Sequence, residues 1–119
     1  MKPTKIDNRA SQLQMRKEKV ASALQHIASE QADLEQNIDW LDQAAYESRI
    51  KLFDRLRDWY LHEMREIDDA LDRIRDDKYG RCMACHHPID SGRLDSFPQA
   101  AFCSACQSAR EAVEKCDRG

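Results

Sequence analysis

The segments Cys82-Met83-Ala84-Cys85 and Cys103-Ser104-Ala105-Cys106, separated by seventeen residues, hold four of the five cysteines of the chain. Two residues between the cysteines of each pair let the backbone curl so that both sulfurs face one point. Four thiolates then complete a closed tetrahedral shell around zinc. The separation of the two pairs is typical of four-cysteine zinc fingers. The sequence therefore predicts one structural Zn²⁺ held by Cys82, Cys85, Cys103 and Cys106.

Other uses of these cysteines are less consistent with the rest of the chain. Disulfides need an oxidising compartment, whereas the sequence begins Met-Lys-Pro-Thr-Lys with no apolar leader and has no window of transmembrane length. We therefore expect a reduced, cytoplasmic protein without a membrane partner. A catalytic zinc would keep one coordination position for water, which four cysteines leave no room for. His86 and His87 follow directly and could replace a missing ligand, but four cysteines make neither necessary.

The composition indicates a mostly helical chain that is not an enzyme. The 119 residues include only three glycines and three prolines, and 34% of them are charged. The net charge of -3 argues against a general nucleic-acid binder, which usually has a surplus of basic residues. The segment His62-Glu63-Met64-Arg65-Glu66 begins like a metalloprotease helix but lacks the second histidine. No glycine precedes residue 80, so a phosphate-binding loop is absent from that part.

Two long runs of apolar residues at three- and four-residue steps predict a pair of helices. The first run is a heptad pattern with a narrow seam, in which Lys17 and Gln31 stand at two grid points. Its apolar positions are Leu13, Val20, Leu24, Ile27, Leu34, Ile38 and Leu41. The second run has Tyr46, Ile50, Phe53, Leu56, Tyr60, Met64, Ile67, Leu71 and Ile74. Neither helix can bury its seam alone, so we expect them to fold back on each other.

The ends of these helices are predicted from charged and capping residues. A turn near residues 38–44 would let the helices run antiparallel, and Asp39 and Asp42 are good N-caps for the second helix. Its end is expected near Lys78, with Gly80 as the left-handed cap. The predicted fold is mainly α: a long antiparallel coiled-coil hairpin over residues 1–79, and a small four-cysteine zinc-finger head with a C-terminal helix over 80–119.

Within the head we expect a small hairpin whose apolar side chains, from Ile89, Leu94, Phe97 and Phe102, lie over the metal. A capping box of Ser104 with Gln107 would start the last helix. Cys116, the fifth cysteine, is expected to pack as a small hydrophobe, with a reactive thiol as the alternative. A unit of about forty residues is too small to be stable by burial alone, so the metal should be needed for its fold.

The order of these motifs resembles the DksA/TraR family of bacterial transcription factors. The segment Asp39-Trp40-Leu41-Asp42-Gln43-Ala44 matches the Asp-x-x-Asp-x-Ala motif of that family. The segment from Asp77 to Cys85, with Ile89, Arg93-Leu94, Pro98-Gln99-Ala100 and the second cysteine pair, matches its zinc finger. The resemblance extends from about Ile38 to Ala112. It departs at His86, where family members often have a glycine in a left-handed turn.

This resemblance implies a regulator that binds RNA polymerase and modulates transcription initiation, in keeping with a role in the stringent response. The coiled-coil tip would enter the secondary channel, with Asp39, Trp40, Leu41, Asp42 and Ala44 as its contact residues. The larger members have an extra helical segment before the coiled coil that helps bind the alarmone guanosine tetraphosphate, whereas in this sequence the hairpin is expected to begin almost directly. Candidate contacts to the polymerase or the alarmone are Arg73, Lys78, Arg81 and Arg93. We expect a monomer without sequence-specific DNA binding.

Two readings from other classes stay open at this point. The first is a zinc-finger nucleic-acid-binding protein that uses the basic residues Arg73, Arg75, Lys78, Arg81 and Arg93. The second is a coiled-coil scaffold that oligomerises through its narrow seam. Salt-dependent affinity for free DNA would favour the first reading, and a monomeric mass in solution would count against the second.

Overall fold

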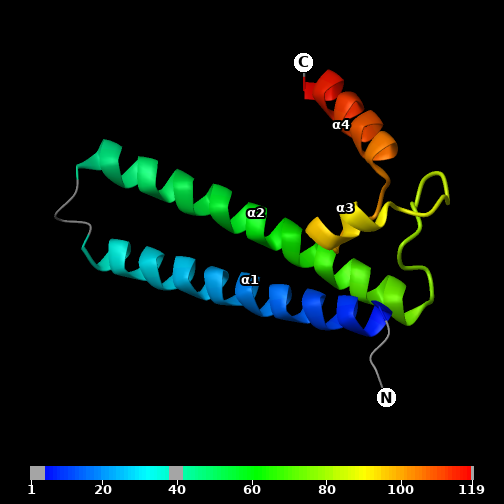
Figure 1. The fold of residues 1–119 in the computed structure, drawn as a ribbon. Helices are drawn as coiled ribbons and strands as arrows, with labels where there is room; N and C mark the ends of the chain where they lie inside the picture. Colours follow the sequence, from blue (N-terminus) through cyan, green and yellow to red (C-terminus); the bar gives the residue numbers. More distant parts are fainter. Residues whose placement is uncertain (1–4, 38–41, 119) are drawn as a thin grey trace. The chain divides into compact units, whose positions relative to one another are not determined.

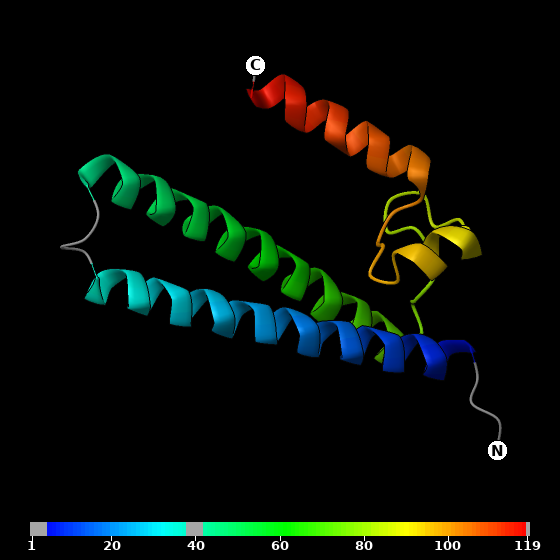
Figure 2. The ribbon, with the colours of Figure 1, turned by 60° about the vertical axis from the view of Figure 1, so that its left-hand side comes forward.

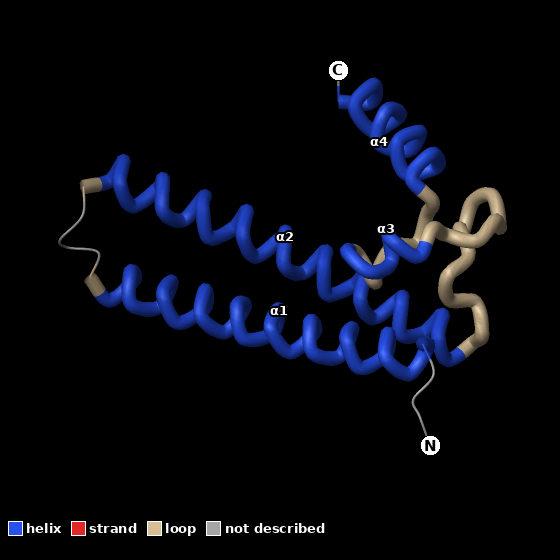
Figure 3. Tube along the Cα trace, viewed as in Figure 1, coloured by secondary structure: helices blue, strands red, loops and turns tan. Residues whose placement is uncertain are grey.

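The computed structural model describes residues 5–37 and 42–118, with side chains from residue 7 to residue 114. Four helices make up most of it (Figures 1 and 3): α1 (Lys5–Gln36), α2 (Gln43–Arg75), α3 (Ser91–Ser96) and α4 (Ser104–Arg118). The prediction of a mainly helical fold with two long helices is confirmed. Asp39, Trp40 and Leu41 of the predicted tip lie outside the described residues.

The chain forms two compact units. Residues 14–65 form one unit, which we call the stalk, and residues 1–13 with 66–119 form the other, which we call the head. Both units contain a segment of α1 and a segment of α2. The division at residue 79, drawn from the sequence between hairpin and finger, stays a prediction.

The seam of the hairpin follows a strict seven-residue repeat on α1. Leu13, Val20, Ile27 and Leu34 are all buried, with at most 6% of each residue exposed. Each step of seven residues is nearly two helical turns, so these side chains share one face. This finding confirms the heptad pattern.

Polar contacts join α1 and α2 across the two sides of the stalk seam. Arg16 donates to Glu63 at 3.0 Å, and Arg57 donates to the side-chain oxygen of Gln31. As the residue number increases along α1, from Arg16 to Gln31, the residue number of the partner on α2 decreases. The two helices therefore run antiparallel, and they lie side by side in Figures 1 and 2. Gln31 is one of the two polar residues at seam positions of the heptad pattern, and its hydrogen bond with Arg57 explains why a polar residue is found there.

The end of α2 differs from the prediction. The helix ends at Arg75 rather than near Lys78, and the left-handed residue of its cap is Asp77, with φ of 57°. The Lys78 N–H donates to the Arg73 carbonyl at 2.8 Å, and the Asp77 N–H donates to the Ile74 carbonyl at 3.3 Å. These two bonds define a Schellman motif. Aspartate tolerates the left-handed region better than most residues, which is how it replaces glycine here.

The head contains a short helix where a hairpin was predicted. Ser91–Ser96 forms α3, and the backbone pairing that exists joins Arg81 and Pro88 in an isolated antiparallel bridge. Ile89 donates its N–H to the Gly80 carbonyl at 2.7 Å beside that bridge. The packing expected of the hairpin is nevertheless present. Ile89, Leu94 and Ala100 form a buried core with Cys82, and Phe97 and Phe102 pack against it.

The capping box predicted for α4 from Ser104 and Gln107 is wrong. The Gln107 N–H donates to the Cys103 carbonyl at 2.9 Å, so Cys103 and not Ser104 occupies the N-cap position. The Gln107 amide group donates to Glu111 at 3.1 Å. A metal-ligand candidate therefore begins the last helix. Within the described residues, no helix is long and apolar enough to cross a membrane.

Candidate functional site

The first cysteine pair sits on a turn closed by backbone hydrogen bonds. The His86 N–H donates to the Cys82 carbonyl at 3.0 Å, and the Cys82 N–H donates to the His87 carbonyl at 2.9 Å. His86 has φ of 64°, in the left-handed region that glycine occupies without a penalty. His86 therefore adopts this conformation despite the steric cost of its Cβ atom. Both His86 and His87 are exposed and stand outside the four-cysteine cluster.

The second pair is brought to the first by the segment before it. The Met83 N–H, at the tip of the first turn, donates to the Ala101 carbonyl at 2.9 Å. The Ala100 N–H donates to the Phe97 carbonyl at 3.0 Å, which forms a turn that directs the chain back to Cys103. Cys106 follows three residues later, within the first turn of α4. Two sequence-distant pairs thus meet in one place.

The four sulfurs have the geometry that zinc requires. All four Sγ atoms lie within 4.8 Å of one another, and those of Cys85 and Cys103 are 3.8 Å apart. A tetrahedron with Zn–S bonds of about 2.3 Å has edges of about 3.8 Å. All four of these cysteines are free thiols, so no disulfide competes for the sulfurs. The cluster fits a four-coordinate metal with no further ligand.

The thiols of the cluster differ in acidity. Burial opposes ionisation of Cys82, but backbone hydrogen bonds from Cys85, Cys103 and Ala84 lower its pKa to about 5. Side-chain hydrogen bonds with Cys103 and Cys82, followed by burial, raise the pKa of Cys106 to about 12. The thiolate form is therefore favoured at Cys82, whereas the Cys106 thiol keeps its proton. A divalent cation would replace these protons when it binds, because metal ligation requires thiolates.

Hydrogen bonds from α2 and the segment after it hold the loop that precedes the second pair. Arg73 donates to the carbonyls of Gln99 and Ala100 at 3.3 and 3.4 Å, and the Tyr79 hydroxyl donates to the Pro98 carbonyl at 2.8 Å. Residues 98–100 are buried. Partial burial lowers the pKa of Arg73 and raises that of Tyr79 from their ordinary values. The loop is therefore attached to the base of the hairpin inside the head unit.

The other basic residues singled out from the sequence are used in part within the head. Arg93 donates to the Phe102 carbonyl at 3.1 Å, and Arg81 reaches the His86 carbonyl at 3.5 Å. Lys78 is exposed. The four residues do not form one cluster of contacts among the interactions described.

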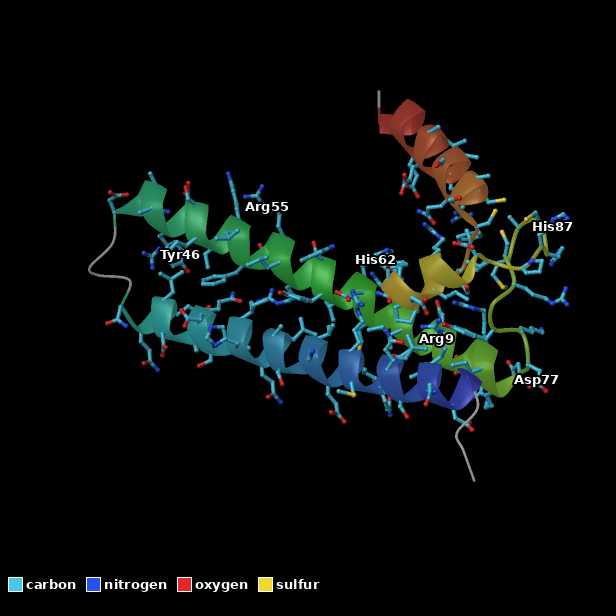
Figure 4. The ribbon with its side chains drawn as sticks, in the orientation of Figure 1. Arg9, Tyr46, Arg55, His62, Asp77 and His87 are labelled. Atoms are coloured by element: carbon cyan, nitrogen blue, oxygen red, sulfur yellow. The ribbon has the colours of Figure 1, made fainter. Side chains whose placement is uncertain are left out.

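One set of contacts between α1 and α3 in the head was not predicted from the sequence. Arg9 of α1, labelled in Figure 4, forms an ion pair with Asp95 of α3, and Gln12 donates to the Asp95 backbone carbonyl at 3.5 Å. These residues lie more than eighty positions apart, so only the folded chain brings them together. A single charge pair of this kind leaves no periodic pattern in the sequence.

At the opposite end of α2, Asp42 caps the helix as predicted. Its Oδ1 accepts a hydrogen bond from the Ala45 N–H at 2.8 Å, and its backbone carbonyl accepts the Tyr46 N–H at 3.1 Å. Asp42 and Ala44 are both exposed. The carboxylate of Asp42 is therefore exposed at the start of α2, two residues before the small side chain of Ala44.

Comparisons with known proteins agree with this arrangement. The chain is 29% identical over 99 residues to the RNA polymerase-binding transcription factor DksA of Escherichia coli K12, covering 83% of this chain and 64% of that protein. It is 34% identical over 77 residues to the DksA of Buchnera aphidicola, covering 65% of this chain and 51% of that protein. The chain thus spans less than two thirds of the length of these relatives. No family model matches it.

A solved structure shows the same fold over nearly the whole chain. The transcription factor DksA2 of Pseudomonas aeruginosa superposes with a TM-score of 0.78 at 28% sequence identity. The superposition covers 96% of this chain and 86% of that one. The likeness therefore includes the hairpin and the head together, and not the cysteine motif alone.

Proposed function

From the confirmed resemblance of this chain to the DksA/TraR family, we propose that it is a transcription regulator that binds bacterial RNA polymerase. Its relatives from Escherichia coli and Buchnera aphidicola are both named RNA polymerase-binding transcription factor DksA. The observation that carries the proposal is the combination of a two-helix hairpin ending in an exposed Asp42 with a four-cysteine head. Both features occur along one chain in the order that the resemblance to this family implies.

The finer mechanism that we propose is insertion of the hairpin tip into the secondary channel of the polymerase. The contact residues would be Asp39, Trp40, Leu41, Asp42 and Ala44. A carboxylate near bound magnesium ions changes the local electrostatic field without reacting itself. Asp42 would shift contacts around the catalytic centre in this way, and exposed Ala44 would permit close approach. The chain would regulate initiation through the polymerase and not through recognition of promoter DNA.

We propose that Cys82, Cys85, Cys103 and Cys106 hold one structural zinc ion. The sulfur separations support this assignment, since they match the edges of a zinc–thiolate tetrahedron. When bound, zinc would neutralise the thiolates and hold the two pairs together. Arg73 and Tyr79 would then keep the buried loop 98–100 fixed on α2. The head would thereby form one rigid docking body.

Binding of guanosine tetraphosphate is a further part of the proposal. Arg73, Lys78, Arg81 and Arg93 are the candidate contacts. Three of them already donate to backbone carbonyls of the head, at 3.1 to 3.5 Å. Lys78 is exposed, and a phosphate would meet its ammonium group without displacing such a bond. Lys78→Ala should therefore reduce any effect of the alarmone more than it reduces polymerase binding.

The test of the tip replaces charge while keeping the helix cap. Asp39 and Asp42 are changed together to asparagine, which caps a helix about as well as aspartate does. Binding to purified RNA polymerase and the lifetime of a ribosomal RNA promoter complex are then measured, with and without guanosine tetraphosphate. We expect binding to persist and the effect on lifetime to disappear. Asp58→Asn, at an exposed position on α2, is the matched control.

Two results would contradict the proposal in different ways. Full activity of the Asp39/Asp42 double variant would remove the role assigned to the tip carboxylates. Absence of binding by the unmodified protein would remove the polymerase as partner and leave the metal site unaffected.

The nucleic-acid-binding alternative has less support from the structure. It depends on basic side chains near the head, but Arg73, Arg81 and Arg93 donate within the chain and Arg75 pairs with Asp72 and Asp76. These cations are partly neutralised or already hydrogen-bonded before any phosphate arrives. Affinity for free DNA that falls steeply with salt would restore this alternative.

A further inference from the structure

The segment between α3 and α4, which leads into the second cysteine pair, forms an unbroken row of hydrogen-bond acceptors. Every backbone carbonyl from residue 97 to residue 103 accepts a hydrogen bond. We call residues 97–103 the carbonyl segment. Its donors, in the order of the carbonyls, are Ala100, Tyr79, Arg73 twice, Met83, Arg93 and Gln107. Because a loop lacks the internal pairing of a helix, these donors from the rest of the head determine its path.

Arg73 is the donor that connects this segment to α2. Its Nη2 atom donates to the carbonyls of Gln99 and Ala100 at 3.3 and 3.4 Å. Gln99 is 1% exposed and Ala100 is 2% exposed, so water has little access to either residue. A buried carbonyl that loses its donor stays desolvated without a compensating bond, which is unfavourable. The guanidinium therefore fixes two adjacent peptide groups immediately before Ala101.

Ala101 is the point at which the two cysteine pairs are joined through the backbone. Its carbonyl accepts the N–H of Met83, which lies between the two cysteines of the first pair, at 2.9 Å. Cys103 follows two residues later, and its Sγ atom is 3.8 Å from that of Cys85. A zinc site tolerates deviations of only about 0.2 Å in its metal–ligand distances. A shift of Ala101 would therefore change the fit of the second pair to the metal.

We infer that Arg73 is a positioning residue of the metal site, which sets from the end of α2 how tightly the four cysteines hold zinc. Groups that orient metal ligands from outside the ligand set contribute to metal affinity in this way. The inference rests on the proposed zinc site and assigns part of its affinity to a hairpin helix. Loss of Arg73 should loosen the joint between the two cysteine pairs and leave the turn of the first pair intact.

The first measurement is the zinc affinity of the full-length protein, by competition with a chelating indicator dye. Arg73→Ala should weaken zinc binding by about tenfold, at the lower end of the loss expected for an orienting group outside the ligand set. Arg73→Lys keeps N–H donors on a long side chain and should stay within about threefold of the wild type. Arg75→Ala is the matched control, because exposed Arg75 pairs with Asp72 and Asp76 on the surface. It should change zinc affinity by less than about twofold.

The second measurement is hydrogen exchange in the zinc-loaded protein, which separates positioning from a general loss of stability. The Met83 N–H, bonded to Ala101, reports on the joint between the pairs. The His86 N–H, bonded to the Cys82 carbonyl at 3.0 Å, reports on the first turn alone. In Arg73→Ala the Met83 N–H should exchange about tenfold faster and the His86 N–H less than about twofold faster. A general loss of stability would accelerate both equally.

The possible results distinguish this inference from the proposed function. Unchanged zinc affinity of Arg73→Ala, with zinc bound by the wild type, would overturn the inference and leave the metal site standing. Equal acceleration of exchange at Met83 and His86 would also overturn it, because the effect would not be local. If Arg73→Ala does not fold, the milder Arg73→Gln replaces it, with the same two results deciding. Failure of the wild type to bind zinc would overturn the inference and the metal assignment together, without affecting the polymerase as partner.

Discussion

Asp42 offers a way to separate the stability of the hairpin from its effect on a partner. The Oδ1 atom of Asp42 accepts the Ala45 N–H at 2.8 Å, and no other side chain is described as capping α2. Asp42→Ala removes this acceptor, so one amide at the helix start loses its partner. The expected loss in the free energy of unfolding is about 1 kcal/mol. For a chain of this size the melting temperature should fall by about 4 °C.

Asp42→Asn should behave differently, because the amide oxygen of asparagine can accept the same hydrogen bond. Its free energy of unfolding should stay within about 0.5 kcal/mol of the wild type. Thermal unfolding of the zinc-loaded protein, followed by circular dichroism at 222 nm, measures both variants. Asp58→Ala, at an exposed position in the interior of α2, is the control and should change stability by less than about 0.5 kcal/mol.

Two outcomes would refute this reasoning. If Asp42→Asn is as unstable as Asp42→Ala, the hydrogen bond at Ala45 is not what the carboxylate contributes. If the promoter-complex effect survives in Asp42→Asn and disappears only in Asp42→Ala, the tip needs its helix cap and not its charge.

Three further predictions concern the head and the seam. Removal of the metal with a chelator should release one zinc per chain, as measured with a zinc indicator dye, and abolish the unfolding transition of the head. Cys82→Ser should have the same effect on the head, whereas Cys116→Ser should retain the metal. Ile67→Ala should lower the free energy of unfolding by about 2–5 kcal/mol in urea titrations, because Ile67 is fully buried. Leu61 is exposed on the same helix, and a cost above about 1 kcal/mol for Leu61→Ala would contradict this account of the seam. His86→Gly should raise the free energy of unfolding of the zinc-loaded head by about 0.5–1 kcal/mol, because a φ of 64° is sterically unfavourable for a residue with a Cβ atom. A loss of stability measured by calorimetry would show that the His86 side chain makes a stabilising contact.

The features that the sequence predicted best are those with a period. Burial of Leu13, Val20, Ile27 and Leu34 follows directly from their seven-residue spacing. The cysteine cluster was predictable for a similar reason, because the spacing within each pair fixes the turn and zinc chemistry fixes the number of ligands. Such patterns depend on local geometry, which the sequence carries without knowledge of distant contacts.

The features that were not predicted depend on contacts between residues far apart in the sequence, or on residue types that can adopt more than one structural role. Asp77 took the left-handed cap position that Gly80 was expected to fill, because aspartate and glycine can both adopt it. The segment with Leu94 became a helix because one turn already buries this side chain in the head core. Ala70 is fully buried, yet alanine gives no periodic signal of its own. Arg9 and Asp95 met only through folding.

The seven-residue repeat of α1 limits how the length of the stalk can change during evolution. Deleting one residue from the repeat would rotate every later side chain by about 100° and turn the apolar face toward water. Deleting seven from each helix would restore the register and shorten each by about 10.5 Å. Variants of this architecture that differ in reach should therefore differ by matched heptads, and intermediate lengths should be rare.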